Sequence, residues 1–474
     1  MAEQFPDRAR TPAHDPAQDP AHDPAHDPAQ DPGRAAQARV MEDEAVRFAS
    51  DLIRIDTTNH GGGDGNERPA AEYVAEKLDA AGIVPTILES VPGRTNVVAR
   101  IPGSEPDLDA LLVHGHLDVV PAQPVDWTVH PFSGEVRDGV VWGRGAVDMK
   151  GTDAMVLAVV RAWAREGRRP RRDVVLAFTA DEEDTAAHGA GFLVRKHPDL
   201  FEGCTEGIGE SGAFTFHAGQ GRRLYPVGAG ERGTAWLKLT AQGRAGHGSK
   251  VNRTNAVTRI AAAVTRIGEY RWPVRLIPTV RAALTEIAAL EGLEANLDDP
   301  GFDIDGLIAK LGPAAKLIEP VVRNSSNPTM LEAGYKVNVI PGTATAYVDG
   351  RILPDGAAEF AETMDRLTGP YVDWHFHHNE VPLQAPVDSP TYAAMREALE
   401  HHDPGGHVVP YCMSGGTDAK QFSKLGITGY GFSPLKLPEG FDYQALFHGV
   451  DERVPVEALH FGARVLDRFL SRVG

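Results

Sequence analysis

Two patterns of apolar and polar residues follow one another along the chain, and each predicts its own kind of element. In the first pattern, apolar residues three and four positions apart predict helices, and short runs rich in valine and leucine predict strands between them. The predicted helices are residues 41–57, 68–82 and 152–167, and the predicted strands are residues 83–90, 95–103, 109–116 and 171–183. Helices that alternate with apolar strands indicate an α/β sheet covered by helices on both faces.

The second pattern begins near residue 231, where apolar and polar residues alternate as in a strand with one exposed face. The elements predicted here are a strand at residues 234–243, a helix at 252–270, strands within 337–353 and a helix at 357–369. Half-exposed strands beneath helices indicate a separate α+β domain. The first pattern returns after residue 384, with helices predicted at residues 389–402 and 455–473.

These patterns predict one large domain, residues 41–230 and 385–474, interrupted by an inserted domain, residues 231–384. Residues 1–40 precede both domains, and between residues 11 and 33 they repeat the units AHDP and AQDP. The repeated prolines block helix formation and the repeat has almost nothing apolar to bury, so we expect a disordered tail. His14, His22 and His26 of the repeat could chelate a metal loosely, but a solvated low-complexity segment is the favoured interpretation.

The composition narrows the class of protein. With 474 residues, 42% of them hydrophobic, the chain can bury a large core. Its net charge of −19 argues against a nucleic-acid or anionic-membrane surface. No apolar run reaches the roughly 18 residues of a membrane span, and the first residues lack the apolar segment of a secretory signal, so we expect a cytoplasmic protein. Only Cys204 and Cys412 occur, so any metal has to be held by histidine and carboxylate groups.

The predicted strand at residues 109–116 ends in the sequence "HGHLD", with His114, His116 and Asp118 at alternate positions. Alternate side chains of an extended chain share a face, so these three could point into one cavity. Taken alone, the motif fits either a metal site or ordinary hydrogen bonding at the end of a strand.

Further acidic residues stand at the ends of other predicted elements. Asp148 precedes a helix, Asp181 to Glu183 follow a strand, and Glu210 lies in "GIGESG". In an α/β sheet, sites form at the carboxyl ends of the strands, where these groups would meet. Histidine with several carboxylates suits zinc, cobalt or manganese in a hydrolytic site. The adjacent Glu182 and Glu183 diverge, so one can bind metal while the other moves the protons of the attacking water.

The ordered motifs "GHLDVVP", "GRGAVDMKG", "TADEE", "GES", "GRAGHGSK", "SGGTDA" and "FHG" resemble those of the M20 family of metallopeptidases and amidohydrolases. The resemblance runs from about Met41 to the C-terminus. It implies the fold of the phosphorylase/hydrolase-like zinc exopeptidases, with an α/β catalytic domain and an inserted α+β lid that also serves dimerisation. It also implies two divalent metal ions, zinc first, with cobalt or manganese as alternatives.

The resemblance assigns a role to each matched residue. His116 and Glu210 would bind one metal ion, Glu183 and His448 the other, and Asp148 would bridge both. Asp118 would orient His116, Glu182 would be the general base, and His247 would stabilise the oxyanion, in many family dimers from the partner's lid. The expected substrate contacts are Arg351 as a carboxylate clamp, Asn338, Gly415, Gly416 and Thr417. His114 matches no family position and is expected to be structural.

The implied function is hydrolysis of an amide or peptide bond next to a free carboxylate, in an N-acyl-amino acid, a dipeptide or a C-terminal residue. The expected partner is such a small molecule or short peptide, in a homodimer that binds neither nucleic acid nor membrane. A carbamoyl-amide hydrolase of the same family, or a non-catalytic peptide-binding protein with the same fold, remains an alternative. Two departures are a glycine after His247, where serine or alanine is common, and an extra stretch at residues 286–317, which could widen the pocket or change the dimer contact.

Overall fold

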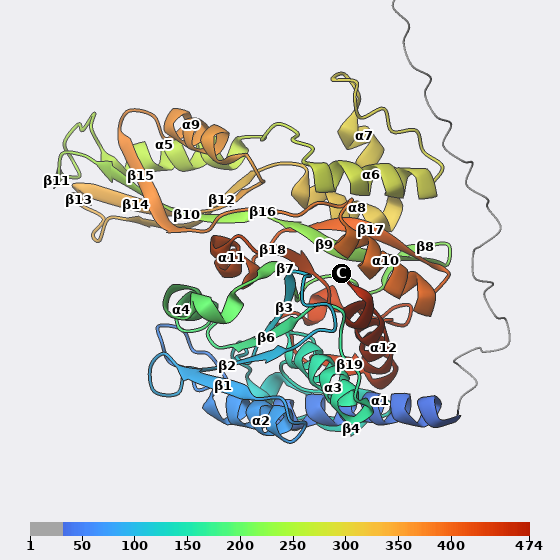
Figure 1. The fold of residues 1–474 in the computed structure, drawn as a ribbon. Helices are drawn as coiled ribbons and strands as arrows, with labels where there is room; N and C mark the ends of the chain where they lie inside the picture. Colours follow the sequence, from blue (N-terminus) through green and yellow to red (C-terminus); the bar gives the residue numbers. More distant parts are fainter. Residues whose placement is uncertain (1–31) are drawn as a thin grey trace, which may run out of the picture.

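The computed structural model describes residues 32–474, whose two larger sheets have helices packed on them (Figure 1). The large sheet has the strand order β1-β2-β6-β3-β7-β18-β9-β16, and β8 and β17 also pair with β9. Its strands are β1 (Pro85–Glu89), β2 (Thr95–Ile101), β3 (Ala110–His116), β6 (Val174–Thr179), β7 (Cys204–Gly209), β8 (Phe216–Gly219), β9 (Arg222–Glu231), β16 (Leu383–Gln384), β17 (Gly406–Met413) and β18 (Thr428–Gly431). The neighbours β6, β3, β7 and β18 run parallel to one another, so their carboxyl ends lie at one edge.

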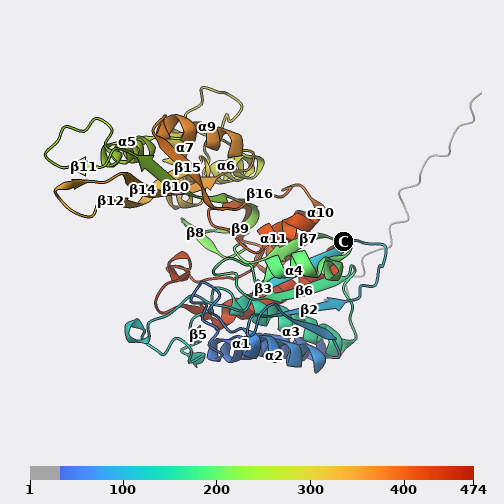
Figure 2. The ribbon, with the colours of Figure 1, turned by 90° about the vertical axis from the view of Figure 1, so that its left-hand side faces the viewer.

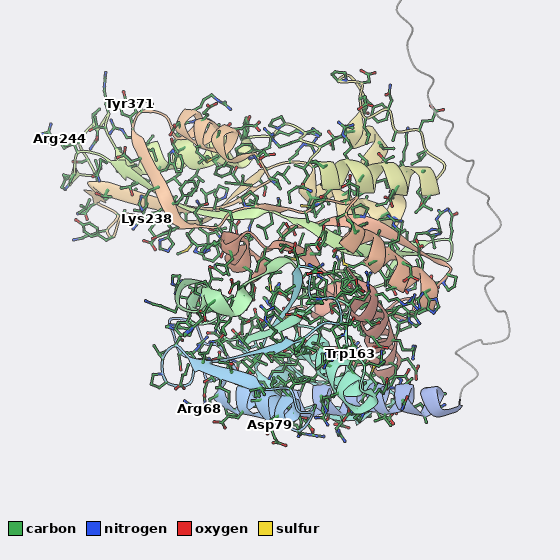
Figure 3. The ribbon with its side chains drawn as sticks, in the orientation of Figure 1. Arg68, Asp79, Trp163, Lys238, Arg244 and Tyr371 are labelled. Carbon is green, nitrogen blue, oxygen red and sulfur yellow. The ribbon has the colours of Figure 1, made fainter. Side chains whose placement is uncertain are left out.

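Helices cover both faces of the large sheet, as the alternation of helices and strands predicts. Alternate residues of β3 enter different cores: Leu111 and Val113 pack in the core on one face, and Leu112 packs in the core on the other. The first core is formed with α1 (Pro32–Arg54), α2 (Arg68–Asp79), α3 (Lys150–Glu166), α10 (Pro390–His402) and α12 (Val456–Arg472), and the second with α4 (Ala190–Lys196) and α11 (Ala419–Phe422). Trp163 of α3, labelled in Figure 3, is buried and its Nε1 donates to Asp467 of α12 at 2.5 Å.

Local chemistry accounts for several helix ends. The side chain of Ser389 accepts a hydrogen bond from the Tyr392 N–H at the start of α10. At the other end of a helix, Gly167 closes α3 with a φ of 64°, a left-handed conformation that suits glycine. The buried Lys150 ammonium donates to the carbonyl groups of Leu52 and Ile55 at the C-terminus of α1, where cations are favoured.

Helix α1 corrects the predicted extent of the N-terminal tail. Residues 1–31 lie outside the described part of the chain, but residues 32–40, which the tail prediction included, are helical. Beyond Pro32 no proline occurs before Pro69, and the segment is rich in alanine, arginine and glutamate. These residues have high helix propensity, so the helix begins nine residues before Met41.

The second sheet has the order β12-β14-β10-β15 and projects beyond the large sheet (Figures 1 and 2). Its strands are β12 (Ser325–Ala333), β14 (Thr343–Ile352), β10 (Gly233–Gln242) and β15 (Val372–Asn379). Helices α5 (Ala256–Glu269) and α9 (Ala357–Thr368) pack on one face, over Leu237 and Leu239 of β10. Lys238 lies between these two leucines in sequence and therefore faces away from the helices (Figure 3).

The extra stretch at residues 286–317 packs against the large sheet rather than the second one. It contributes to α6 (Pro278–Leu290), α7 (Ile304–Ile308) and α8 (Ala315–Ile318), which share a core with Leu224 of β9 and Val409 of β17. Figure 1 shows α6 and α8 beside β17 and α7 beyond α6, all three away from α5 and α9. We therefore propose that, within the predicted insertion, α6, α7 and α8 belong with the large sheet and not with the lid.

Smaller elements complete the described chain. β11 (Gly246–His247) pairs with β13 (Val339–Ile340), and β19 (Arg453–Pro455), β5 (Val140–Trp142) and β4 (Glu135–Arg137) form a three-stranded sheet. Among the described residues, no helix combines the length and the apolar character that crossing a membrane requires.

Candidate metal centre

The carboxyl edge of the large sheet gathers the polar residues that end its parallel strands. His116 is the last residue of β3, Asp181 to Glu183 follow β6, and Glu210 follows β7. Because β6, β3 and β7 are adjacent and parallel, these residues lie at the same edge. Asp148, just before α3, and His448, in the loop before β19, join them from outside the sheet.

Five of these side chains form two clusters that could each hold a metal ion. His116, Asp148 and Glu210 form one cluster, and Asp148, Glu183 and His448 form the other, with the possible ligand atoms of each cluster within 4.8 Å of one another. Asp148 belongs to both. Its Oδ1 lies 3.0 Å from His116 Nε2, and its Oδ2 lies 3.4 Å from His448 Nε2. The two oxygens of one carboxylate thus face the two clusters, as a bridging ligand requires.

Charge crowding at this edge favours a bound cation. Burial, together with the charge of Asp148, raises the pKa of Glu210 to about 8 and that of Glu183 to about 7. Burial also raises the pKa of Glu182, with the charge of Glu210 adding to it. Hydrogen bonds with Asp148 and Glu183 raise the pKa of His448 to about 10. Carboxylates that repel one another in a buried place are stabilised in their charged form by a divalent ion.

The donor atoms also fit such an ion chemically. Each cluster offers one imidazole nitrogen and two carboxylate groups, the ligands that zinc, cobalt and manganese accept. Glu183 Oε2 lies 3.0 Å from His448 Nε2, whereas its Oε1 is buried and has no hydrogen-bond partner. A buried carboxylate oxygen without a partner is unfavourable, and a metal ion at this cluster would provide one.

Asp118 holds both His116 and the acidic loop after β6. The main-chain oxygen of Asp118 lies 3.0 Å from His116 Nδ1, and its carboxylate Oδ1 lies 3.7 Å from the same nitrogen. The carboxylate oxygens accept the backbone N–H groups of Glu182 and Glu183, each at 3.1 Å. Asp118 therefore fixes the ring of His116 through its main chain and the two glutamates through its side chain.

His114 lies apart from both clusters. Its ring packs on Phe422 with the centroids 5.2 Å apart, and burial lowers its pKa to about 3, so the ring is neutral. A Cβ atom on Gly209 would approach the ring to 2.3 Å, so the ring occupies space that the glycine leaves. These contacts agree with a structural role for His114.

Glu452 supports the loop that carries Asp148, and the sequence did not single it out. It is fully buried, and its Oε1 accepts the backbone N–H groups of Val147 at 2.7 Å and Asp148 at 3.0 Å. Its Oε2 pairs with Arg144 at 2.7 Å. The carboxylate thus holds the main chain at the residue whose side chain joins the two clusters.

We expect Glu452→Gln to weaken metal binding about 10- to 100-fold while the protein stays folded, because groups that support metal ligands typically contribute this much. The amide keeps the shape of the carboxylate, but only its oxygen can accept hydrogen bonds, whereas both oxygens of Glu452 accept them. Titration of the metal-free protein with cobalt measures the change. Glu397→Gln, which removes a surface pair with Arg468, is the control and should leave metal affinity unaltered.

A cavity of about 200 Å³ connects the acidic loop with the second sheet. Its lining residues are Glu182, Glu183, Asp184, Thr185, Ala186, Thr234, Trp236, His378, Glu380, Gly416, Thr417, Asp418 and Gln421. The candidate base Glu182 and the candidate ligand Glu183 therefore open onto a space that strands β10 and β15 of the second sheet also border. A substrate in this cavity would contact both parts of the chain.

The predicted substrate contacts divide into two groups. Gly416 and Thr417 line the cavity and Gly415 precedes them, but the hydroxyl and N–H of Thr417 are already bonded to Glu231, at 2.7 and 3.2 Å. Arg351 borders the cavity indirectly: its Nη1 donates to Thr234 at 3.2 Å, while Nε and Nη2 form a bidentate pair with Asp349.

His247 and Asn338 lie together, away from the metal clusters. The Gly248 N–H donates to the Asn338 carbonyl at 2.9 Å, and His247 Nδ1 lies 2.8 Å from the Ser249 hydroxyl. Both side chains are exposed. Figure 1 places β11 and β13 at the far end of the second sheet, away from β16, an edge strand of the large sheet.

Comparisons with known proteins agree with this arrangement. The chain matches the model of peptidase family M20/M25/M40 over residues 112–472. It is 28% identical over 449 residues to the N-fatty-acyl-amino acid synthase/hydrolase PM20D1 of Xenopus tropicalis, covering 88% of this chain and 83% of that protein. It is 27% identical over 452 residues to aminoacylase-1 of Sus scrofa, covering 92% and 97%. An M20 family metallo-carboxypeptidase from Sulfolobus solfataricus has the same fold, with a TM-score of 0.66 at 19% identity over 90% of this chain and 98% of that one.

Proposed function

Because the chain belongs to peptidase family M20/M25/M40, whose matched members are metal-dependent hydrolases, we propose that it is a two-metal hydrolase of N-acyl-amino acids or short peptides with a free carboxylate. The observation that carries the proposal is the pair of ligand clusters that share Asp148 and lie beside Glu182. The similarity to aminoacylase-1 and to PM20D1 supports N-acyl-amino acids as the first substrates to test.

His116, Glu210 and Asp148 would hold one ion, and Glu183, His448 and Asp148 the other. When bound, the ions supply Lewis-acid activation of the scissile carbonyl and of the attacking water. Glu182 lies 4.0 Å from His116 Nε2 and lines the cavity, so its carboxylate is placed to take a proton from that water. It then gives the proton to the nitrogen of the leaving group, which completes hydrolysis of the amide.

The lid residues would act on the rest of the substrate. Arg351 would bind the free carboxylate through its planar guanidinium, which requires Asp349 to release or share it. Gly415, Gly416 and Thr417 would bring the loop after β17 against the substrate. His247 is exposed at the end of the lid, which fits a role in the centre of a second subunit, where it would stabilise the oxyanion. The homodimer and the cytoplasmic location remain predictions.

We expect the chelator-stripped protein to lose hydrolysis of N-acyl-amino acids and dipeptides and to regain it with two zinc, cobalt or manganese ions per chain. The measurement is a substrate screen run alongside metal analysis. Each N-acyl-amino acid is paired with the same compound blocked as its carboxamide, which we expect to react about 100-fold more slowly because it lacks the carboxylate charge. Full activity of the stripped protein, or equal rates on both members of each pair, would contradict the proposal.

A further inference from the structure

A buried ionic cluster lies directly behind the turn that carries Glu182 and Glu183. Arg94 Nη2 lies 2.7 Å from Asp181 Oδ1 and 3.1 Å from Glu67 Oε1, and none of these three side chains is exposed to solvent. Arg94 immediately precedes β2, and β2 pairs with β6, the strand that leads into the turn. None of these three residues is part of the two ligand clusters.

Asp181 has an unusual backbone conformation, and both oxygens of its carboxylate accept hydrogen bonds that hold it. Its φ is 66°, in the left-handed region that residues other than glycine seldom adopt. One carboxylate oxygen accepts from Arg94, and the other accepts the His188 N–H at 3.0 Å and the Thr185 hydroxyl at 3.2 Å. Such a conformation persists when the surroundings determine it, and here it directs the two residues that follow.

Asn59 connects this cluster with Asp118. Its side-chain amide donates to Asp118 Oδ2 at 2.9 Å and to Asp181 Oδ1 at 3.3 Å. Asp118 in turn accepts the N–H groups of Glu182 and Glu183. The turn is therefore held by Asp118 along its main chain and by Arg94 through the residue before it.

The cluster is poorly arranged for stability alone. Glu67 Oε2, and Nε and Nη1 of Arg94, are buried without a hydrogen-bond partner, and Glu67 Oε1 contacts Arg94 only through the ion pair. A buried ion pair with unsatisfied atoms is weak evidence for a stabilising role. The backbone at Gly65 nevertheless leaves space for the arginine, because a Cβ atom at this position would lie 2.2 Å from Arg94 Nη1.

We propose that Arg94 is a positioning residue of the metal centre: acting through Asp181, it sets the turn that aims Glu183 at the ligand cluster with His448 and Glu182 at the cavity. The arginine touches neither metal ligand atoms nor the cavity lining, so its effect passes through the backbone of the turn. The proposal rests on the proposed function for its kinetic readout, whereas its metal-binding readout is independent of any substrate.

The test compares Arg94→Met with Arg94→Lys in the full chain, by cobalt titration followed in the visible spectrum and by steady-state kinetics. For Arg94→Met we expect about 10- to 100-fold weaker cobalt binding at the cluster of Asp148, Glu183 and His448, with the cluster of His116, Asp148 and Glu210 retained. We expect kcat to fall while KM changes less than about threefold, because the turn carries the base rather than the substrate contacts. Arg94→Lys, which keeps the charge, should recover part of both losses.

Arg172→Met is the matched control. Arg172 is also a buried arginine in an ion pair, with Glu206 at 2.9 Å, but its Nη2 donates to the carbonyl of Ala110, at the opposite end of β3 from His116. Arg172→Met should lower the unfolding temperature without changing cobalt binding or kcat.

The proposal is wrong if Arg94→Met, like this control, leaves cobalt binding and kcat unchanged, or if it lowers the cobalt affinity of both clusters equally. Should Arg94→Met fail to fold, Asp181→Asn decides, because it keeps the side-chain shape and must show the same selective loss. Should the natural protein cleave nothing in the screen, the proposed function fails while the cobalt titration still decides the role of Arg94.

Discussion

Glu182→Gln is expected to leave two metal ions bound and to lower kcat about 10³-fold, the range typical of a lost general acid–base group. The amide has nearly the shape of the carboxylate but cannot take a proton from water. Glu182 belongs to neither ligand cluster, so metal content should be unchanged. Metal analysis of the purified variant, together with its steady-state rate on an N-acyl-amino acid, measures both quantities.

Asp184→Asn is the control for this substitution. Asp184 lies two residues away in the same turn and lines the same cavity, but its carboxylate accepts the backbone N–H of Gly62 at 3.0 Å. We expect its kcat to change by no more than about threefold, because hydrogen bonding to a main-chain group moves no proton in the reaction. A rate near that of the natural protein for Glu182→Gln, with metal content intact, would show that another group is the base.

Much of the large sheet could be predicted because its central strands are short, apolar and buried on both faces. β3 and β6 are examples: β3 ends at His116, as predicted, and β6 ends at Thr179, four residues before the predicted end at Glu183. β9 and β17 were not predicted. They contain Pro226 and Pro410, and proline within a run argues against a central strand. The two strands nevertheless pair in parallel, with Pro226 opposite Val409.

The placement of residues 286–317 illustrates a different limit. An amphipathic helix shows from its sequence that one face needs an apolar partner, but not which partner. Ile287 and Leu317 pack in a core with strands of the large sheet, although the chain around them belongs to the predicted insertion. Only the three-dimensional arrangement distinguishes lid material from a second layer on the large domain.

The sequence likewise indicates the candidate ligands of the site but not the residues that support them. The candidate ligands stand in ordered motifs, and all but His448 lie at the ends of predicted elements, so the sequence brings them to attention. Arg94 and Glu452 are single polar residues whose partners, Asp181 and Asp148, lie 87 and 304 positions away. No local spacing connects such pairs, and their burial is visible only in the fold.

The two histidines in "HGHLD" test whether the alternate residues of this strand end bind metal together or whether His116 is a ligand and His114 is structural. His116→Ala removes the imidazole whose Nε2 lies 3.0 Å from Asp148, the residue common to both clusters. We expect it to lose the metal ion of that cluster and to lower kcat about 10³-fold or more, since a three-ligand cluster with one ligand missing cannot hold the ion in place. Metal analysis and kinetics on the same preparation measure both losses.

His114→Ala is the matched substitution two residues away on the same strand. It removes a buried ring that packs on Phe422, so it should lower the free energy of unfolding by about 2–4 kcal/mol through the cavity it leaves. Metal content and kcat per folded molecule should stay within about twofold of the natural protein, because the neutral ring belongs to neither cluster. Equal loss of metal and rate in both variants would mean that the alternate residues of the strand end act together as ligands. Loss of metal and rate in His116→Ala alone would identify His116 as a ligand and His114 as a structural residue.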